Sequence, residues 1–249
     1  MPSALHRLLA VLSILAIPAQ AQEPAPNLAI PAAAPLLDGQ LTEWTTPPSL
    51  VLAKKQQVIA GSWNGEADLA ASLWIGADRS HLYVAGWVQD DQMASEAALD
   101  RLDRVDCLEL HCGFGAGGEV GIRQPDESPL VLLPLHPTRT WMWLDPTRAA
   151  SQAGASLSGL RVVGKRTSPT RFEFEAAIPF HHFVSLRPGQ QRCGLNVVLR
   201  DQDGKDEDPT VMSWTGRDPA QPKSLAAAEL LPPGPLVPQP EPSSRWAGD

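Results

Sequence analysis

Cysteine and basic residues are both scarce in this sequence. Only 3 of the 249 residues are cysteine, and none of them has the Cys-x-x-Cys or Cys/His spacing of a zinc site. This scarcity excludes a disulfide-rich scaffold and the common zinc-binding motifs. Lysine and arginine number 20 against 28 aspartate and glutamate, which gives a net charge of −8. Because the basic footprint of a nucleic-acid-binding protein is missing, we expect no nucleic-acid partner.

Motifs of several enzyme classes are also missing. No Gly-x-Ser-x-Gly elbow occurs, and the glycine run that begins at Gly115 departs from the Gly-x-Gly-x-x-Gly spacing at Val120. Glu173 and Glu175 lie two apart on one predicted strand, which makes a glycosidase-like carboxylate pair geometrically imaginable. Their alternation with Arg171 is more typical of the solvated face of a sheet. We therefore predict a protein that is not an enzyme.

Long hydrophobic runs are confined to the first 21 residues. His6 and Arg7 precede an apolar run from Leu8 to Ile17, and Ala19-Gln20-Ala21 supplies a small-x-small cleavage pattern. The run is too short to cross a bilayer comfortably. Residues 1–21 are therefore predicted to be a signal peptide, and the mature protein to be secreted or periplasmic without a membrane span.

Proline-rich segments follow the signal and close the chain. Residues 22–35 are rich in alanine and proline, and residues 232–249 begin with a dense proline run. Such compositions are typical of extended linkers and tails. A single folded domain is therefore expected over residues 36–231.

Within these limits the sequence lacks long helical periodicity and instead repeats short alternating runs. The clearest hairpin runs from Ser72–Ile75 through the turn Ala77–Ser80 to Leu82–Val88. Alternation of apolar and polar residues recurs over 107–114 and over 171–178. A repeat of the length of a propeller blade is missing. The pattern therefore predicts an all-β fold, a two-sheet antiparallel β-sandwich.

Six motifs in a fixed order carry a resemblance to known domains. They are Leu37-Asp38-Gly39 with Glu43-Trp44, Leu82-Tyr83-Val84 with Val88-Gln89-Asp90-Asp91, Asp106-Cys107-Leu108-Glu109-Leu110, Phe172-Glu173-Phe174-Glu175 with Ala177-Ile178-Pro179, Gly194-Leu195-Asn196-Val197 with Asp201-Gln202-Asp203, and Ser213-Trp214. Together they resemble the family 9 carbohydrate-binding modules and the wider group of DOMON-like sandwich domains. The resemblance covers nearly all of residues 36–231.

The resemblance implies a jelly-roll-like sandwich that binds poly- or oligosaccharide against tryptophan and holds structural calcium. It also implies association with polysaccharide-degrading enzymes, and the sequence is expected to carry no catalytic module of its own. An alternative function follows from DOMON-like domains that carry a b-type haem for electron transfer. The candidate haem ligands here are Met93, Met142 or Met212 with His81 or His111. A methionine at alternating strand spacing is more often a core residue.

A cluster of aspartates predicts a structural calcium site. Carboxylate oxygens on a turn are ligands that calcium prefers. The loop is not an EF-hand, because Gly204 takes its fourth place and no glutamate stands at the twelfth. A solvated acidic loop is the alternative interpretation, and a second acidic group occurs at predicted strand ends. The proposed calcium ligands are Asp201, Asp203, Asp206 and Asp208, and the second group is Asp90, Asp91 and Asp106.

Two tryptophans with polar neighbours are the predicted sugar-binding residues. A pyranose presents an apolar face that matches indole and edge hydroxyls that need polar partners. Trp63 with Asn64 lies in a glycine-flanked loop, and Trp214 with Arg217 lies at a predicted strand end. Three other tryptophans, Trp44, Trp74 and Trp87, are assigned mainly to core packing, and the pair Trp141 and Trp143 to packing under a loop.

The three cysteines leave two possibilities open. Cys107 and Cys112 are five apart in one predicted strand and therefore face opposite sides, so they cannot bond to each other. A bridge between Cys112 and Cys193 is the remaining pairing, and three buried free thiols are the alternative.

Overall fold

The computed structural model describes most of the expected domain. The described residues are 28–93, 106–113, 130–134, 143–144, 159, 161–182, 191–204, 207–218 and 224–231. The predicted signal peptide and the proline-rich tail lie outside these residues, as does Trp141. No helix in the described part of the chain is long and apolar enough to cross a membrane.

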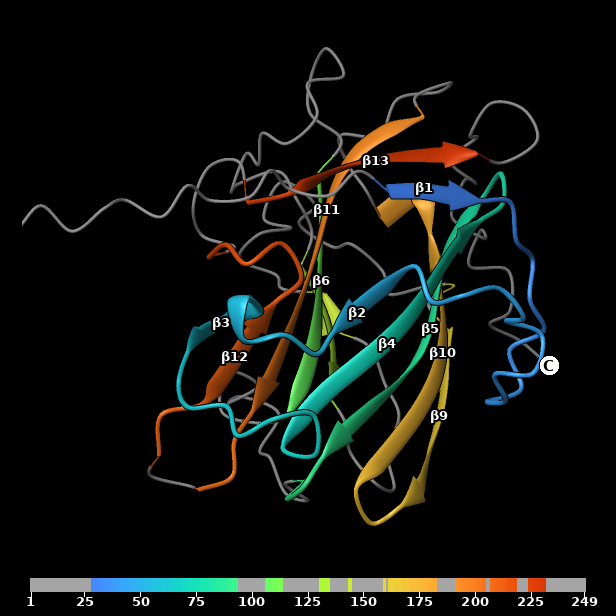
Figure 1. Cartoon of the computed structure of the whole chain (residues 1–249). Coiled ribbons are helices and arrows are strands. Elements are labelled where there is room, and N and C mark those ends of the chain that lie inside the picture. Colours follow the sequence, from blue (N-terminus) through green and yellow to red (C-terminus); the bar gives the residue numbers. More distant parts are fainter. Residues whose placement is uncertain are drawn as a thin grey trace, which may run out of the picture.

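Two β-sheets form the fold (Figure 1). The eight-stranded sheet has the order β1 (Leu28–Pro31), β13 (Ala226–Leu231), β11 (Arg192–Asp201), β6 (Cys107–Gly113), β7 (Leu130–Pro134), β8 (Trp143–Leu144), with β12 (Thr210–Ser213) pairing both β11 and β3 (Val58–Ala60). The five-stranded sheet has the order β2 (Leu50–Leu52), β4 (Leu69–Ala77), β5 (His81–Asp90), β10 (Arg171–Pro179), β9 (Arg161–Ser168). Short 3-10 turns occur at Lys55–Gln57 and Phe180–His182. The predicted all-β sandwich is confirmed.

The predicted hairpin is the β4–β5 pair, with Ile75 opposite Val84 and Leu73 opposite Gly86. Alternate residues of each strand point into the space between the sheets, where Leu73, Ile75 and Val84 are almost fully buried. Side chains from β6, β10 and β11 complete the same hydrophobic core. Burial of one such side chain stabilises the folded state by roughly 1.5–3 kcal/mol. A strand with its apolar residues on the wrong face would lose this free energy at every second position, so the alternation specifies which face turns inward.

The N-terminal limit of the sandwich differs from the expected one. Residues 22–35 were expected to be an extended linker, but Leu28–Pro31 of that segment forms β1 and pairs in parallel with β13. Ile30 is completely buried in the core. The short run Leu28-Ala29-Ile30 is apolar but follows a proline-rich stretch, so local composition did not predict it as a strand. Pairing with β13 and burial of Ile30 in the core stabilise it there. All other strand pairings are antiparallel among the described strands.

Trp74 and Trp87 lie on the outer face of the five-stranded sheet, which corrects their assignment to the core. Each alternates with the buried residues of its own strand and is half-buried. The indole N–H of Trp74 donates to the carbonyl of Thr46 at 2.7 Å, and the Arg171 guanidinium lies 4.3 Å from the centre of a Trp87 ring. Both rings are half-buried on this outer face because neighbouring groups cover part of each ring, and the polar partners suit the indole N–H and the ring face.

All three cysteines are buried free thiols. In the β6–β11 register Cys112 lies opposite Leu195, so Cys193 is its diagonal neighbour. Diagonal positions in an antiparallel pair are about 7–8 Å apart, which is beyond the usual span of a disulfide. The arrangement agrees with the free-thiol alternative.

Candidate functional site

Six aspartates, in two groups of three, gather where strands of the two sheets end, and together they are called the acidic nest. Its inner part consists of Asp90 at the end of β5, Asp106 before β6 and Asp201 at the end of β11, all three buried. Their carboxylate oxygens lie within 4.8 Å of one another. Since Asp90 belongs to one sheet and Asp201 to the other, this inner trio joins the two layers of the sandwich.

A second group, the outer trio, consists of Asp68, Asp91 and Asp203. Its carboxylate oxygens also lie within 4.8 Å of one another, but only Asp68 is buried. The backbone brings two members together, because the Asp91 N–H donates to the Asp68 carbonyl at 3.1 Å.

The electrostatics of the inner trio favour a bound cation. Burial, followed by the negative charges of neighbouring carboxylates, raises the pKa of Asp201, and burial with the charges of Asp203 and Asp91 raises the pKa of Asp90. No described residue gives a hydrogen bond to Asp90 Oδ2 or Asp201 Oδ1, although both atoms are buried. A buried carboxylate oxygen without a partner is costly, and a cation with oxygen ligands would satisfy both. The all-oxygen donor set suits calcium.

The predicted calcium ligands are only partly brought together. Asp201 and Asp203 enter the nest with the second predicted group, Asp90, Asp91 and Asp106. Asp208 is exposed and lies outside both trios, and Asp206 lies outside the described residues.

Sequence reasoning missed Asp68, because the residue precedes a strand far along the chain from the other aspartates. Its only signal was position, a few residues before the predicted hairpin. In the structure Asp68 directly precedes β4, which pairs with β5, the strand that ends at Asp90. Two paired strands place such ends side by side.

The Trp63 loop runs along the exposed side of the nest. The Trp63 indole N–H donates to the carbonyl of Leu69 at 2.8 Å, and the Asn64 backbone N–H donates to Asp68 Oδ2 at 2.6 Å. Trp63 is half-buried and packs against the core, whereas Asn64 and Glu66 are exposed. The loop therefore holds an aromatic ring by a hydrogen bond and core packing, and two exposed polar residues follow the ring in the same loop.

Trp214 occupies a different setting from Trp63. It follows β12, is half-buried and also packs against the core. Its carbonyl accepts a hydrogen bond from the Gln57 side chain at 3.4 Å, and the Arg217 carbonyl accepts one from Ser213 Oγ at 2.7 Å. Packing holds one side of the Trp214 ring, so at most part of it faces solvent.

The β3–β12 register separates the two predicted tryptophans. Val58 pairs with Met212 and Ala60 with Val211, so the strands are antiparallel. Trp63 follows β3 and Trp214 follows β12, which places them beyond opposite ends of the ladder. They do not form the two sides of one narrow slot in this arrangement.

A buried charged group on the outer face of the eight-stranded sheet was also missed. Glu109 of β6 contacts His111 Nε2 at 2.9 Å and forms an ion pair with Arg200 of β11. Burial works to raise the pKa of Glu109, but the hydrogen bond from His111 and the charge of Arg200 outweigh it and lower the pKa to about 2. The motif Asp106–Leu110 contained Glu109, but alternation only placed it on the face opposite the inward-facing leucines and gave no sign of its partners.

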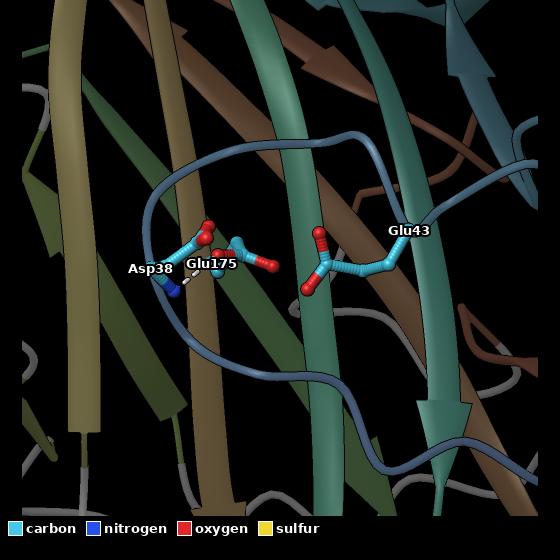
Figure 2. A group of neighbouring side chains, drawn as sticks. All are labelled: Asp38, Glu43 and Glu175. Atoms are coloured by element: carbon cyan, nitrogen blue, oxygen red, sulfur yellow. Dashed lines mark hydrogen bonds between the residues drawn. The ribbon is translucent and has the colours of Figure 1, made fainter.

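A third acidic group lies where the N-terminal strap crosses the five-stranded sheet. The strap is defined as residues 32–49, between β1 and β2. Figure 2 shows Asp38 and Glu43 of the strap directed toward Glu175 of β10. Glu175 Oε2 accepts the backbone N–H groups of Asp38 at 3.0 Å and Gly39 at 2.7 Å, and Oε1 accepts the indole N–H of Trp44 at 2.9 Å.

Glu175 is therefore an anchor for the strap, and the expected solvated position is wrong. Its exposed fraction is 0%. The sharp turn that delivers two N–H groups uses Gly39, whose φ of 77° is a conformation that glycine adopts without strain. This contact joins two motifs that are far apart in the sequence. The strap contributes Asp38-Gly39 and Trp44 as donors, and β10 contributes Glu175 as the acceptor.

The described candidates for haem ligation have packing or polar partners of their own. Met93 and Met212 belong to the hydrophobic core, which agrees with the core interpretation of these methionines. His81 contacts Ser80 Oγ through Nδ1 at 2.8 Å, and His111 contacts Glu109. Met142 lies outside the described residues.

Comparison with known proteins identifies similar folds. No protein-family model and no curated protein matches the chain. A solved family 9 carbohydrate-binding module from Caldicellulosiruptor kristjanssonii in complex with cellotriose has a TM-score of 0.62 and 15% identity, over 84% of this chain and 95% of that chain. The module from the same organism in complex with glucose has a TM-score of 0.59 and 14% identity, over 84% of this chain and 97% of that chain. At these identities the likeness shows that this chain and the two solved modules share a β-sandwich fold.

Proposed function

We propose that this chain is a secreted, non-catalytic carbohydrate-binding domain that recognises a poly- or oligosaccharide by tryptophan stacking. The observation that carries the proposal is the Trp63 loop, which presents a clamped, half-exposed indole beside exposed Asn64 and Glu66. The similar solved structures, one with cellotriose and one with glucose, support the same ligand class. The N-terminal signal pattern supports export.

The chemistry of the loop suits a sugar ring. A pyranose offers C–H groups to the indole face and hydroxyls to side chains at the ring edge. Because the Trp63 N–H is already bonded to Leu69, the ring does not lose much freedom when a ligand arrives. Trp214 with Arg217 is the second proposed contact for a longer ligand, and polysaccharide-degrading enzymes are the proposed partners of the domain.

Truncation of the ring tests this site. Trp63→Ala should weaken binding of cellotriose or another bound oligosaccharide by about 1–3 kcal/mol, by analogy with base stacking on aromatic side chains. The measurement is isothermal calorimetry on the mature protein, after a glycan array has chosen the sugar. Trp214→Ala is measured beside it.

Trp87→Ala is the matched control, because it removes a half-buried tryptophan from the outer face of the other sheet. The control should melt at a lower temperature and keep the wild-type affinity. If Trp63→Ala and Trp214→Ala both bind as tightly as the wild type while melting cooperatively, the tryptophan site is wrong.

The inner trio of the nest is proposed to hold a structural calcium ion. The support is the pair of buried carboxylate oxygens, on Asp90 and Asp201, that no described residue satisfies. Calcium supplies positive charge and accepts several carboxylate oxygens at one centre. Asp90, Asp106 and Asp201 would hold it and so link the two sheets.

Removal of calcium should therefore destabilise the protein. A ligand present at 100 times its Kd stabilises the folded state by about 2.7 kcal/mol, which for a domain of this size corresponds to about 5–10 °C in melting temperature. Excess EDTA should lower the melting temperature by that amount and added calcium should restore it. An identical melt with EDTA and with calcium would show that no structural calcium is bound.

A further inference from the structure

The chain contains three asparagines, and Asn64 is the one that a glycine follows. Asn64 is exposed in the Trp63 loop, and Gly65 has a φ of 118°, which glycine adopts without strain. The space beside Gly65 is open, since a Cβ placed there would meet no described atom beyond its chain neighbours within 4 Å. We propose that Asn64–Gly65 is a site of spontaneous deamidation, at which the folded loop converts its asparagine to aspartate and isoaspartate.

The reaction needs only water and a free backbone nitrogen. The Gly65 nitrogen gives its proton to the solvent and attacks Cγ of Asn64. The new N–C bond closes a succinimide ring, and the side-chain nitrogen leaves as ammonia. Water then opens the ring at one of its two carbonyls, which yields aspartate or isoaspartate. One amide and one water thus become one carboxylic acid and one ammonia, so the step requires no oxidant or reductant.

The loop leaves both reacting groups free and holds the chain on either side of them. In the part of the chain that the structure describes, neither the Asn64 side-chain amide nor the Gly65 N–H makes a hydrogen bond. The Asn64 N–H donates to Asp68 Oδ2 at 2.6 Å, and the Gly65 carbonyl accepts the N–H groups of Asp68 at 3.1 Å and Leu69 at 3.2 Å. The Gly65 nitrogen therefore has no acceptor to lose before it reacts.

Two other positions show how the fold protects such groups. Asn196 is completely buried, its Nδ2 donates to Ser213 Oγ at 3.0 Å, and a valine follows it. Gly39 also follows an acidic residue that could close the same ring, but its N–H donates to Glu175 Oε2 at 2.7 Å. Neither protection exists at Asn64, so we expect the folded protein to lose ammonia there and not at Asn196.

Conversion would change the loop that carries Trp63. Isoaspartate adds one carbon to the main chain between residues 64 and 65. Both products place a new carboxylate on the residue whose N–H is bonded to the Asp68 carboxylate. Because like charges repel, this hydrogen bond should weaken and the loop should loosen. The resulting loss of sugar affinity rests on the proposed function, whereas the deamidation itself does not.

Peptide mapping tests the proposal. The mature protein is incubated at mildly alkaline pH, digested with trypsin and analysed by mass spectrometry. The tryptic peptide 56–79, whose one asparagine is Asn64, should gain the mass of an amide-to-acid conversion and should contain isoaspartate at position 64. The peptide 193–200, which contains Asn196, should stay unchanged. Asn64→Gln should abolish the conversion at position 64.

A parallel incubation in guanidinium chloride measures the same conversion in the unfolded chain. The folded protein should convert Asn64 at a similar rate, because the loop does not protect it. Conversion in the folded protein that is slower by about tenfold or more would overturn the proposal, since the fold would then protect the site. Aspartate without isoaspartate at position 64 would also overturn it, because direct hydrolysis would then replace the succinimide route.

Calorimetry on the deamidated protein separates this site from the proposed function. Its affinity for the sugar should be lower than that of fresh protein. If the deamidated protein binds the sugar as tightly as fresh protein, the role of the Trp63 loop in sugar binding is contradicted, whereas the deamidation stands on the mass measurements.

Discussion

Replacing Glu175 with alanine is expected to lower the free energy of unfolding by about 3–5 kcal/mol. The carboxylate is completely buried and accepts three hydrogen bonds, from the backbone of Asp38 and Gly39 and from the indole of Trp44. Its removal leaves three donors of the strap without their acceptor. Urea denaturation at neutral pH measures the change.

Glu173→Ala is the matched control for this prediction. Glu173 is the preceding outward-facing residue of the same strand, and its ion pair with Arg171 is partly exposed, with side-chain exposures of 20% and 35%. Such a pair is worth about 1 kcal/mol or less. Equal losses for the two variants would contradict the anchoring role of Glu175. Glu175→Gln should fall between them, because the amide keeps one acceptor oxygen for the strap.

Glu109→Gln is expected to destabilise the protein by about 2–3 kcal/mol at pH 6. The substitution removes the negative charge that faces Arg200 and that His111 contacts, at a position where the Glu109 side chain is 7% exposed. Arg200, at 26% exposure, keeps some contact with water, so the loss is smaller than for a fully buried pair.

The effect of Glu109→Gln should also depend on pH. The pKa of Glu109 lies at about 2 in the folded protein, below its ordinary value of 4.5. The unfolded chain therefore takes up this proton first, and the stabilisation is complete above about pH 4.5 and is lost as the pH falls toward 2. The stability difference between wild type and Glu109→Gln, measured by denaturation from pH 6 to pH 3, should shrink accordingly. A difference that stays constant over this range would falsify the ionised role of Glu109.

Local alternation was enough to predict the central strands β4, β5, β6, β10 and β11 and their inward faces. The hairpin of β4 and β5 follows from apolar residues two apart on both sides of a turn at Asp78, and the same period places Leu108, Leu110, Leu195 and Val197 in the core. These predictions succeed because the side-chain direction in a strand depends only on position along the chain.

The aspartates show where this reasoning reaches its limit. Carboxylates near strand ends predicted an acidic group, but its membership depends on which strand ends meet. Asp68 joins because β4 pairs with β5, and Asp106 meets Asp201 because β6 pairs with β11. Asp208 is close in sequence and yet stays outside the nest.

Composition and the period of two determined the fold class and the central strands, and they supplied the residue types from which a cation site and a sugar site were predicted. Tertiary structure alone decided that Glu175 is buried beneath the strap, that Glu109 faces Arg200, and that Trp63 and Trp214 lie beyond opposite ends of β3–β12. The physical reason is that burial and charge pairing of an outward-facing side chain depend on segments distant in sequence. Local alternation determines which side chains face the core. Whether an outward-facing side chain is buried or paired depends on which distant segments of the chain cover that face of the sheet.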